Sequence, residues 1–195
     1  MSDTITVHHL IEMTGPYDCY VYDRYVPDIS AEEEIERAVD VHVRAYMGDD
    51  AVKMLIGGDW SLLADHGRAM IRAALSEGIV YAVKHGNDIV AFGLWFEPGK
   101  AVFSSAAQRA LGFDDFFEKL NPEVQFWYQN EYPQSVGAQR ALLYREEETY
   151  WWCSSLATDP DHQNKGYGKA IVNTAFEKAK KVGHFISFAA GSELN

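Results

Sequence analysis

The sequence predicts an α/β protein with a mixed α+β sheet, and three observations support this. Apolar and aromatic runs alternate with segments whose apolar residues recur every three or four positions. Two runs, Ile79 to His85 and Ile89 to Phe96, flank Gly86-Asn87-Asp88, whose residues tolerate the positive φ of a hairpin turn. A later run, Tyr150 to Leu156, is followed by a helix and another strand, an order that favours parallel pairing.

The first third of the chain is expected to hold two strands and two helices. Thr4 to Ile11 is a candidate for a short strand or an ordered tail, and Tyr17 to Val26 for a strand. Ser30-Ala31-Glu32-Glu33 is a capping box for the first helix, and Gly78 ends the second, which runs from Trp60 to Glu77. The inward stripe of the first helix is Ile35, Val39, His42, Val43 and Tyr46. Two histidines are interpreted as packed core residues: His42 and His66.

Residues 98–147 are expected to form an aromatic-rich insertion within a single domain spanning 1–195. Its large rings are Phe103, Phe113, Phe116, Phe117, Phe126, Trp127, Tyr128, Tyr132 and Tyr144. So aromatic a stretch must fold back on the protein, and one or two short helices are predicted, foremost at Asp114 to Leu120. Two interpretations remain open. The stretch forms a wall or lid over the site where a substrate binds, or it forms additional scaffold or a dimer face.

Composition limits the classes of partner. The chain holds 29 acidic and 17 basic residues, and its net charge of −12 argues against a nucleic-acid partner and favours cationic acceptors such as amines. Cys19 and Cys153 are too few for a disulfide framework and lack metal-site spacing, so both are expected to be buried thiols.

The start of the sequence, Met1 to Thr14, has neither a basic beginning nor a long apolar run, so no signal peptide is expected. No segment reaches the roughly twenty apolar residues of a membrane span. We therefore expect no membrane association and an intracellular, cytoplasmic location.

The most informative segment is Gln163-Asn164-Lys165-Gly166-Tyr167-Gly168, which lies between the Tyr150 strand and a helix predicted from Lys169 to Val182. Gly183 follows that helix as a left-handed stop. Its apolar residues at helical spacing are Ile171, Val172, Ala175, Phe176 and Ala179. A strand, glycine turn and helix direct free backbone N–H groups and the positive end of a helix dipole at an anion. The segment therefore predicts a phosphorylated ligand.

Three other ligand-binding loops are excluded because the residues that they require do not occur at the necessary spacing. A Walker-type loop requires Gly-Lys followed by Ser or Thr, whereas Gly168-Lys169 precedes Ala170. A dinucleotide-binding fingerprint requires a third small residue where Ile171 stands. A calcium loop starting at Asp159 would need glycine in place of Asn164.

The pattern that remains, Gln-x-x-Gly-x-Gly preceded by Leu156-Ala157-Thr158-Asp159-Pro160, closely resembles the acyl-CoA-binding motif of the GCN5-related N-acetyltransferase (GNAT) superfamily. The resemblance implies a GNAT-like fold and direct transfer of an acetyl group from acetyl-CoA to a primary amine. The acceptor would be a small-molecule amine or a lysine or N-terminal amine. Acetyl-CoA is implied as co-substrate, and no metal is expected.

The resemblance also implies roles for individual residues. The Leu156 N–H would bond the thioester oxygen, and Ala157 and the Thr158 backbone would line the pantetheine arm between two splayed strands. The pyrophosphate would lie against Gln163, Asn164, Lys165, Gly166, Tyr167, Gly168 and Lys169.

The base that takes the proton from the amine is left open. Ser154 and Trp152, which stand two and four residues before Leu156, are not bases. The nearest ionisable candidates are Glu148, Tyr150 and Glu97, acting through water. The structural alternative is strand-end solvation for both glutamates and sheet packing for Tyr150.

His184 to Ala190 is expected to form the next strand, after which the sequence ends without the further helix and closing strands usual in the family. Such a strand would be an open sheet edge, so we expect a homodimer or strand exchange through it, or a truncated form with impaired catalysis. Two functions therefore remain, an N-acetyltransferase and a non-catalytic acyl-CoA-binding or interaction module. A generic nucleotide-binding protein is a third, more remote interpretation.

Overall fold

The computed structural model describes residues 9–10, 19–22, 29–85, 88–144 and 149–189. Within these, six strands form one sheet whose order follows the chain. The strands are β1 (His9–Leu10), β2 (Cys19–Tyr22), β3 (Ile79–His85), β4 (Asp88–Phe96), β5 (Tyr150–Thr158) and β6 (Phe185–Ser187). Neighbours from β1 to β5 are antiparallel, and β5 and β6 are parallel. The predicted mixed sheet is thereby confirmed.

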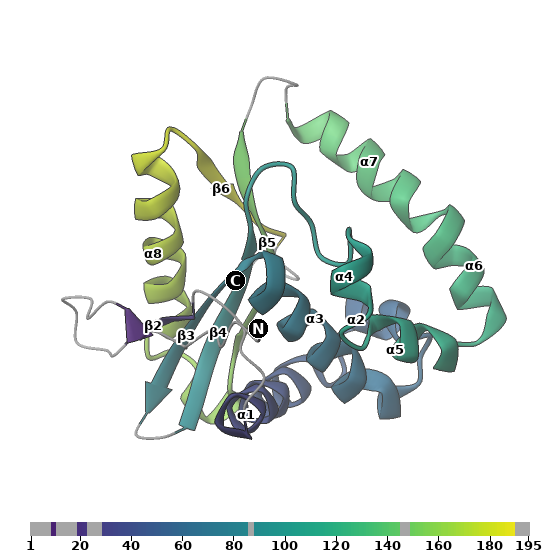
Figure 1. Ribbon diagram of the computed structural model, residues 1–195, viewed down its shortest axis with the longest axis horizontal. Coiled ribbons are helices and arrows are strands. Elements are labelled where there is room, and N and C mark those ends of the chain that lie inside the picture. Colours follow the sequence, from purple (N-terminus) through teal and green to yellow (C-terminus); the bar gives the residue numbers. More distant parts are fainter. Residues whose placement is uncertain (1–8, 11–18, 23–28, 86–87, 145–148, 190–195) are drawn as a thin grey trace, which may run out of the picture.

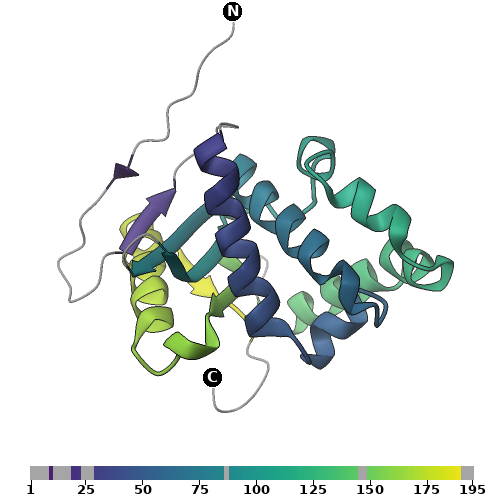
Figure 2. The same ribbon diagram turned by 90° about the horizontal axis from the view of Figure 1, so that it is seen from below.

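Helices cover both faces of this sheet (Figures 1 and 2). Helix α1 (Ile29–Tyr46) begins within one residue of the predicted capping box. It packs with α3 (Leu63–Glu77), which the short 3-10 helix Trp60–Leu62 precedes, on one face. Helix α8 (Tyr167–Lys181) covers the other face. The core between them is therefore split by the sheet into two layers.

The layer under α8 depends on a glycine in the middle of β4. A Cβ at Gly93 would lie 2.7 Å from Cγ2 of Ile171 and 2.8 Å from Nε1 of Trp95. Glycine at this position therefore lets α8 pack directly on the sheet, which fixes the start of α8 relative to β5. Of the apolar residues noted at helical spacing, Ile171, Ala175 and Ala179 are buried against the sheet, whereas Phe176 is 41% exposed.

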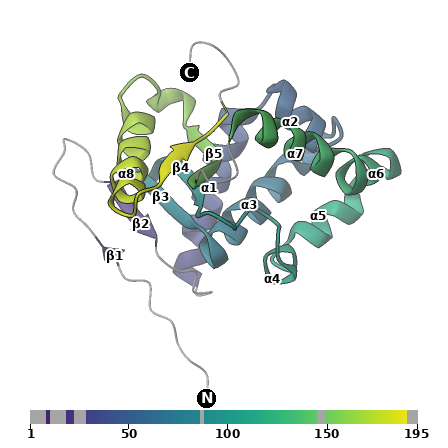
Figure 3. The same cartoon turned by 90° about the horizontal axis from the view of Figure 1, so that it is seen from above.

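The predicted aromatic insertion is more helical than expected. It holds α4 (Ala106–Arg109), α5 (Phe113–Lys119), α6 (Pro122–Asn130) and α7 (Tyr132–Leu143), and α5 matches the predicted helix. A further short helix, α2 (Asp50–Leu55), was not predicted. Phe113, Phe116 and Leu120 build a separate core against α2 and α3, and Tyr128 donates to the Leu55 carbonyl at 3.0 Å. Helices α6 and α7 lie at the opposite end of the molecule from α8 (Figures 1 and 3).

Two buried histidines lie between α1 and α3. His42 is 1% and His66 3% exposed, and their ring centroids are 5.8 Å apart. Burial lowers the pKa of His42 to about 3 and that of His66 to about 4, so both are neutral near pH 7. A Cβ at Gly67 would lie 2.5 Å from the His42 ring, which shows how closely the two helices approach. The prediction that both histidines are core residues is confirmed.

Cys153 is a buried thiol, as predicted, and burial raises its pKa to about 12. The side chain of Cys19 lies outside the described part of the structure. Within the described residues, no helix is both long enough and apolar enough to cross a bilayer, and no cluster of three or more His, Cys, Asp or Glu side chains could hold a metal ion.

Candidate active site

Strand β5 has one open edge over its second half. β6 pairs only with the first three residues, Tyr150 to Trp152, whereas β4 accompanies β5 as far as Thr158. Among the described residues, no strand therefore pairs with the other side of β5 beyond Trp152. This is the splayed arrangement in which the pantetheine arm was expected, and Figure 3 shows β6 leaving β5 beside α8.

A β-bulge resets the faces of β5 at the start of its open part. Leu94 pairs with Ser155 and Trp95 with Cys153, so Ser154 is the extra residue. Before the bulge, Trp151 and Cys153 face α8; after it, Leu156 faces α8 and Ala157 faces α1 and α3. Ala157 is 2% exposed, and its main chain points toward β4 because successive strand residues alternate between the two edges.

The main chain of Leu156 faces the open edge and meets the hydroxyl of Tyr46, the last residue of α1. The Leu156 N–H donates to Tyr46 Oη at 3.3 Å, and Tyr46 Oη lies 3.1 Å from the Leu156 carbonyl oxygen. A strand residue directs its N–H and C=O to the same side. The N–H that was expected to bond a thioester is thus turned away from β4, and in this structure a tyrosine hydroxyl accepts from it.

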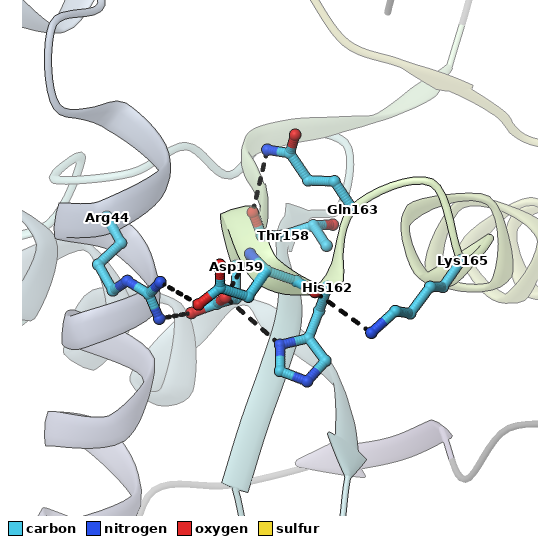
Figure 4. Close-up of polar contacts among 7 residues, drawn as sticks. Arg44, Thr158, Asp159, His162, Gln163 and Lys165 are labelled. Carbon is cyan, nitrogen blue, oxygen red and sulfur yellow. Dashed lines mark hydrogen bonds and ion pairs between the residues drawn. The ribbon is translucent and has the colours of Figure 1, made fainter.

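Two residues further along, a second side chain reaches the same edge. The Gln163 Nε2 lies 3.5 Å from the Thr158 carbonyl oxygen, a long hydrogen bond that closes the end of β5 onto the following loop (Figure 4). Gln163 is exposed, so this contact is readily exchanged for one to a ligand. Leu156 and Thr158 therefore present their main chains on one accessible edge.

The loop between β5 and α8 is held by Asp159. Its N–H donates to the Val90 carbonyl at 2.9 Å, and its carboxylate accepts from the Asp161 N–H at 2.9 Å. Arg44 of α1 donates to Asp159 at 2.5 Å and to Asp161 at 2.7 Å (Figure 4). The Asp161 contact raises the pKa of the Arg44 guanidinium, which in turn lowers the pKa of the Asp161 carboxyl. Helix α1 thus anchors the loop at its beginning.

Beyond Asp161 the loop leaves its main-chain donors open. Among the described residues, no acceptor is present for the backbone N–H groups of Asn164, Lys165, Gly166, Gly168 and Lys169. Two of these residues have left-handed backbone, Asn164 with φ 60° and Gly166 with φ 84°. This conformation turns successive N–H groups toward one side, as in an anion-binding nest, at the positive end of the 15-residue helix α8.

The surface above this loop is also open where a phosphate would lie. A Cβ at Gly168 would meet only Thr158 Oγ1, at an ordinary 3.8 Å, so packing within the protein does not require glycine there. The Lys165 ammonium lies 3.2 Å from the Asp161 carbonyl and folds back along the loop, and Lys169 is exposed. Tyr167 is 7% exposed, so its side chain belongs to the core under α8. The residues present thus fit a diphosphate bound by main-chain amides.

Comparison with known proteins decides the family. The sequence profile described as the acetyltransferase (GNAT) family matches residues 59–193. The chain belongs to the GNAT family. The predicted family, fold class and enzyme class are thereby confirmed.

Solved structures show the same GNAT fold at low sequence identity. An insect arylalkylamine N-acetyltransferase 7 from the yellow fever mosquito gives a TM-score of 0.53 at 16% identity, with 85% of this chain and 64% of that chain covered. Arylalkylamine N-acetyltransferase 2 from Aedes aegypti gives 0.50 at 11%, covering 89% and 76%. The structure of histone acetyltransferase HPA2 and related acetyltransferase from Corynebacterium glutamicum gives 0.50 at 16%, covering 86% and 76%. No curated protein sequence gives a significant match.

The candidate bases of this GNAT protein do not gather around Leu156. Tyr150 begins β5, pairs with Phe185 and stacks on Tyr144 with ring centroids 4.2 Å apart. Leu156 lies six positions further along the strand, a distance of about 20 Å. Glu97 follows the end of β4 near that same end of β5 and pairs with Lys100 at 3.3 Å. Glu148 lies outside the described residues.

Three side chains at this site were not predicted from the sequence. Tyr46 was assigned only to the buried stripe of α1, Arg44 was not singled out, and Ser155, whose Oγ lies 3.1 Å from Tyr46 Oη, was not considered. A partial signal for Tyr46 was available, because a buried tyrosine hydroxyl usually needs a hydrogen-bond partner. No pattern in the sequence could have identified that partner 110 residues away.

Proposed function

We propose that this GNAT protein transfers an acetyl group from acetyl-CoA directly to a primary amine. One observation carries the proposal: the main-chain amides of Asn164, Lys165, Gly166, Gly168 and Lys169, for which the described residues offer no acceptor, follow directly on the open edge of β5. A ligand that combines a diphosphate with an extended amide-containing arm matches both features. Coenzyme A is such a ligand.

In this proposal the loop from Gln163 to Lys169 binds the pyrophosphate through its amides. The pantetheine arm lies along β5 and exchanges hydrogen bonds with the Thr158 main chain, as an added strand would. The thioester then lies beside Leu156, whose N–H leaves the Tyr46 oxygen and donates to the thioester oxygen. Gln163 releases the Thr158 carbonyl as the arm enters.

The bonds that form and break in this reaction belong to the two substrates, and water carries the protons. The amine lone pair attacks the thioester carbon, and the carbonyl π electrons move onto oxygen, where the Leu156 N–H stabilises the negative charge. Collapse of this tetrahedral species restores the carbonyl and breaks the carbon–sulfur bond, releasing the CoA thiolate. A cationic amine first gives one proton to water; after the attack its nitrogen loses a second proton and the thiolate gains one, so the products are the N-acetylated amine, CoA and one released proton. We propose that water carries these protons, because neither Tyr150 nor Glu97 reaches Leu156.

The acceptor is proposed to be a cationic amine. The net charge of −12 favours accumulation of cations near the protein. The structural neighbours are named for arylalkylamine and histone acetylation, and these acceptors differ too much to select one. The panel of acceptors should therefore include aromatic alkylamines, polyamines and a lysine-containing peptide.

One observation favours the non-catalytic alternative. The Leu156 N–H already has an acceptor in Tyr46, and the described candidate bases lie far from it. A protein with this site could bind acyl-CoA without turning it over. Both functions predict CoA binding, so only turnover separates them.

Further proposals concern assembly and location. We propose that β6, which pairs with β5 on one side only among the described residues, pairs with β6 of a second copy. We also propose a cytoplasmic location, which localisation of a tagged protein in cells would test. Sedimentation at micromolar and nanomolar concentrations tests the assembly, and an active monomer at both concentrations would exclude it.

The function itself is tested by free-thiol release from acetyl-CoA with the amine panel, alongside melting temperatures with acetyl-CoA, longer acyl-CoAs, CoA, ATP and NAD. Amine-dependent thiol release is the expected result. Stabilisation by CoA without release for any amine would instead establish the binding module. Stabilisation by ATP or NAD but not by CoA would overturn the proposal in favour of a nucleotide-binding protein.

A further inference from the structure

The Tyr46 hydroxyl lies where the acyl group is proposed to react. Its oxygen is 3.3 Å from the Leu156 nitrogen, 3.1 Å from the Leu156 carbonyl oxygen and 3.1 Å from Ser155 Oγ. We propose that Tyr46 is a catalytic residue whose O–H donates a second hydrogen bond to the thioester oxygen, beside the Leu156 N–H. The inference rests on the proposed function and adds a specific residue to it.

Geometry places the two donors side by side. The Leu156 N–H now points at Tyr46 Oη, so an acceptor oxygen that takes this N–H must approach the hydroxyl closely. Two donors whose heavy atoms are 3.3 Å apart can both reach one oxygen at a usual distance of about 2.9 Å, once the N–H turns from Tyr46 Oη toward that oxygen. The hydroxyl proton then turns from the Leu156 carbonyl to the thioester oxygen, while Ser155 Oγ continues to hold the Tyr46 oxygen.

The ring of Tyr46 is held in place rather than free to swing away. It lies 4.8 Å from the His42 ring, centroid to centroid, and packs against the cores on both sides of α1. Arg44, two residues earlier, is tied to Asp159 and Asp161 of the loop. The hydroxyl is therefore fixed relative to the diphosphate site, and only its proton needs to reorient. Such preorganised donors stabilise developing charge without reorganisation during the reaction.

The chemical state of the hydroxyl suits a donor. Burial raises the pKa of Tyr46, so it stays protonated at the pH values at which amines are acetylated. As the amine attacks, the carbonyl oxygen becomes an oxyanion, and its two hydrogen bonds become charge-assisted and stronger. On collapse the oxygen returns to a carbonyl, and the hydroxyl keeps its proton throughout.

The test compares Tyr46→Phe with Tyr128→Phe as a matched control. The Tyr128 hydroxyl also donates to a main-chain carbonyl, that of Leu55, but where the insertion meets α2. Tyr46→Phe is expected to lower kcat about 100-fold, the usual effect of removing one oxyanion donor. The KM for acetyl-CoA and the stabilisation by CoA, which has no acyl carbonyl, should remain at wild-type values. Tyr128→Phe should retain wild-type kcat.

A direct reading of the hydrogen bond comes from infrared spectra of bound acetyl-CoA labelled with carbon-13 at the thioester carbonyl. In the wild type the carbonyl band should lie below its frequency in water, and Tyr46→Phe should raise it while Tyr128→Phe leaves it in place. An unchanged band and unchanged kcat in Tyr46→Phe would overturn the inference while acetylation stands. Tighter binding and faster turnover in Tyr46→Phe would overturn it too, since the hydroxyl would then merely block the edge. Absence of a bound carbonyl band in the wild type would count against the proposed function itself.

Discussion

The diphosphate loop and the open edge of β5 are neighbours in this molecule but are built in different ways. The loop uses consecutive residues, from Gln163 to Lys169, and its donors are main-chain amides. The edge brings together Leu156 and Tyr46, which are separated by 110 positions in the chain. The loop therefore depends on local backbone conformation, whereas the edge depends on how α1 packs on the sheet.

This difference predicts which amino-acid substitutions each region should tolerate. Side chains in the loop are mostly exposed and can vary, provided that the glycine conformations remain. At the open edge of β5, the Tyr46 hydroxyl makes the contact with the Leu156 main chain. The position of this hydroxyl depends on the buried layer around His42. Backbone substitutions should therefore damage the loop, and changes in side-chain chemistry or core charge should damage the edge.

The largest effect is expected from Gly166→Glu. This residue has φ 84°, a conformation unfavourable for glutamate, and the added carboxylate would repel a diphosphate. We expect CoA affinity to fall by at least about 100-fold, as when charge-assisted hydrogen bonds are lost. Gly183→Glu is the matched control, because Gly183 has φ 75° at the other end of α8. Calorimetric titration with CoA measures both, and wild-type affinity in a folded Gly166→Glu protein would place the diphosphate elsewhere.

A fall in pH should lower the free energy of unfolding through the two histidines buried between α1 and α3. The pKa values of His42 and His66 are lowered in the folded protein, so the unfolded chain takes up protons first as the pH falls below about 6.5. Their contribution to stability is complete above that pH and is lost as the pH falls toward the folded pKa values of about 3 for His42 and about 4 for His66. At pH 5 the loss should reach about 2 kcal/mol for each histidine. Urea unfolding between pH 8 and 4.5 measures this, and constant stability over that range would refute the assignment.

Gly168→Ala should separate stability from ligand binding. The new methyl group meets only Thr158 Oγ1, so the free energy of unfolding should stay level or rise by up to about 1 kcal/mol. The same methyl group occupies the space assigned to the diphosphate, so CoA should bind about tenfold more weakly. Gly137→Ala in α7, where nothing lies within 4 Å of the added carbon, is the control for a change in stability alone. A Gly168→Ala protein that binds CoA as wild type would show that the ligand does not contact this residue.

The smallest effect is expected from Arg44→Gln, which removes the ion pairs between α1 and the loop. The guanidinium is half exposed, so its ion pairs with Asp159 and Asp161 are screened by solvent. CoA affinity should fall about two- to fivefold, and less at high salt. Arg68→Gln removes a comparable pairing with Glu36 and Asp65, away from the loop, and should leave CoA affinity unchanged. Equal effects from both substitutions would mean that Arg44 acts only through general stability.

Much of the fold could be predicted because its signals are local. The strands beginning at Ile79 and Tyr150 are apolar runs bounded by turns, and the predicted helix from Trp60 to Glu77 ends at a glycine. Gly183 has the left-handed conformation expected of a helix stop. The glycine loop was placed correctly for the same reason, since strand, turn and helix are contiguous in sequence.

The remainder depended on contacts between distant segments. Helix α2 has only six residues, too short for a periodic pattern, although Asp49 caps it. Helix α6 was missed despite Asn121-Pro122, a sequence suited to a helix start. Glu148 and Tyr150 were chosen as candidate bases for their nearness in sequence to Leu156, but an extended strand carries such residues far apart, as Tyr150 shows. The prediction for Glu148 concerns a residue outside the described structure.

The bulge at Ser154 decides which way the second half of β5 faces. A regular strand of the same nine residues would rotate that half by half a repeat, so Leu156 would offer its amide to β4 and turn its side chain from α8 toward α1. Removing Ser154 would instead leave Ser155 opposite Leu94 in a regular ladder, with Leu156 on its present face. The orientation of the open edge thus depends on the strand absorbing one extra residue at this point.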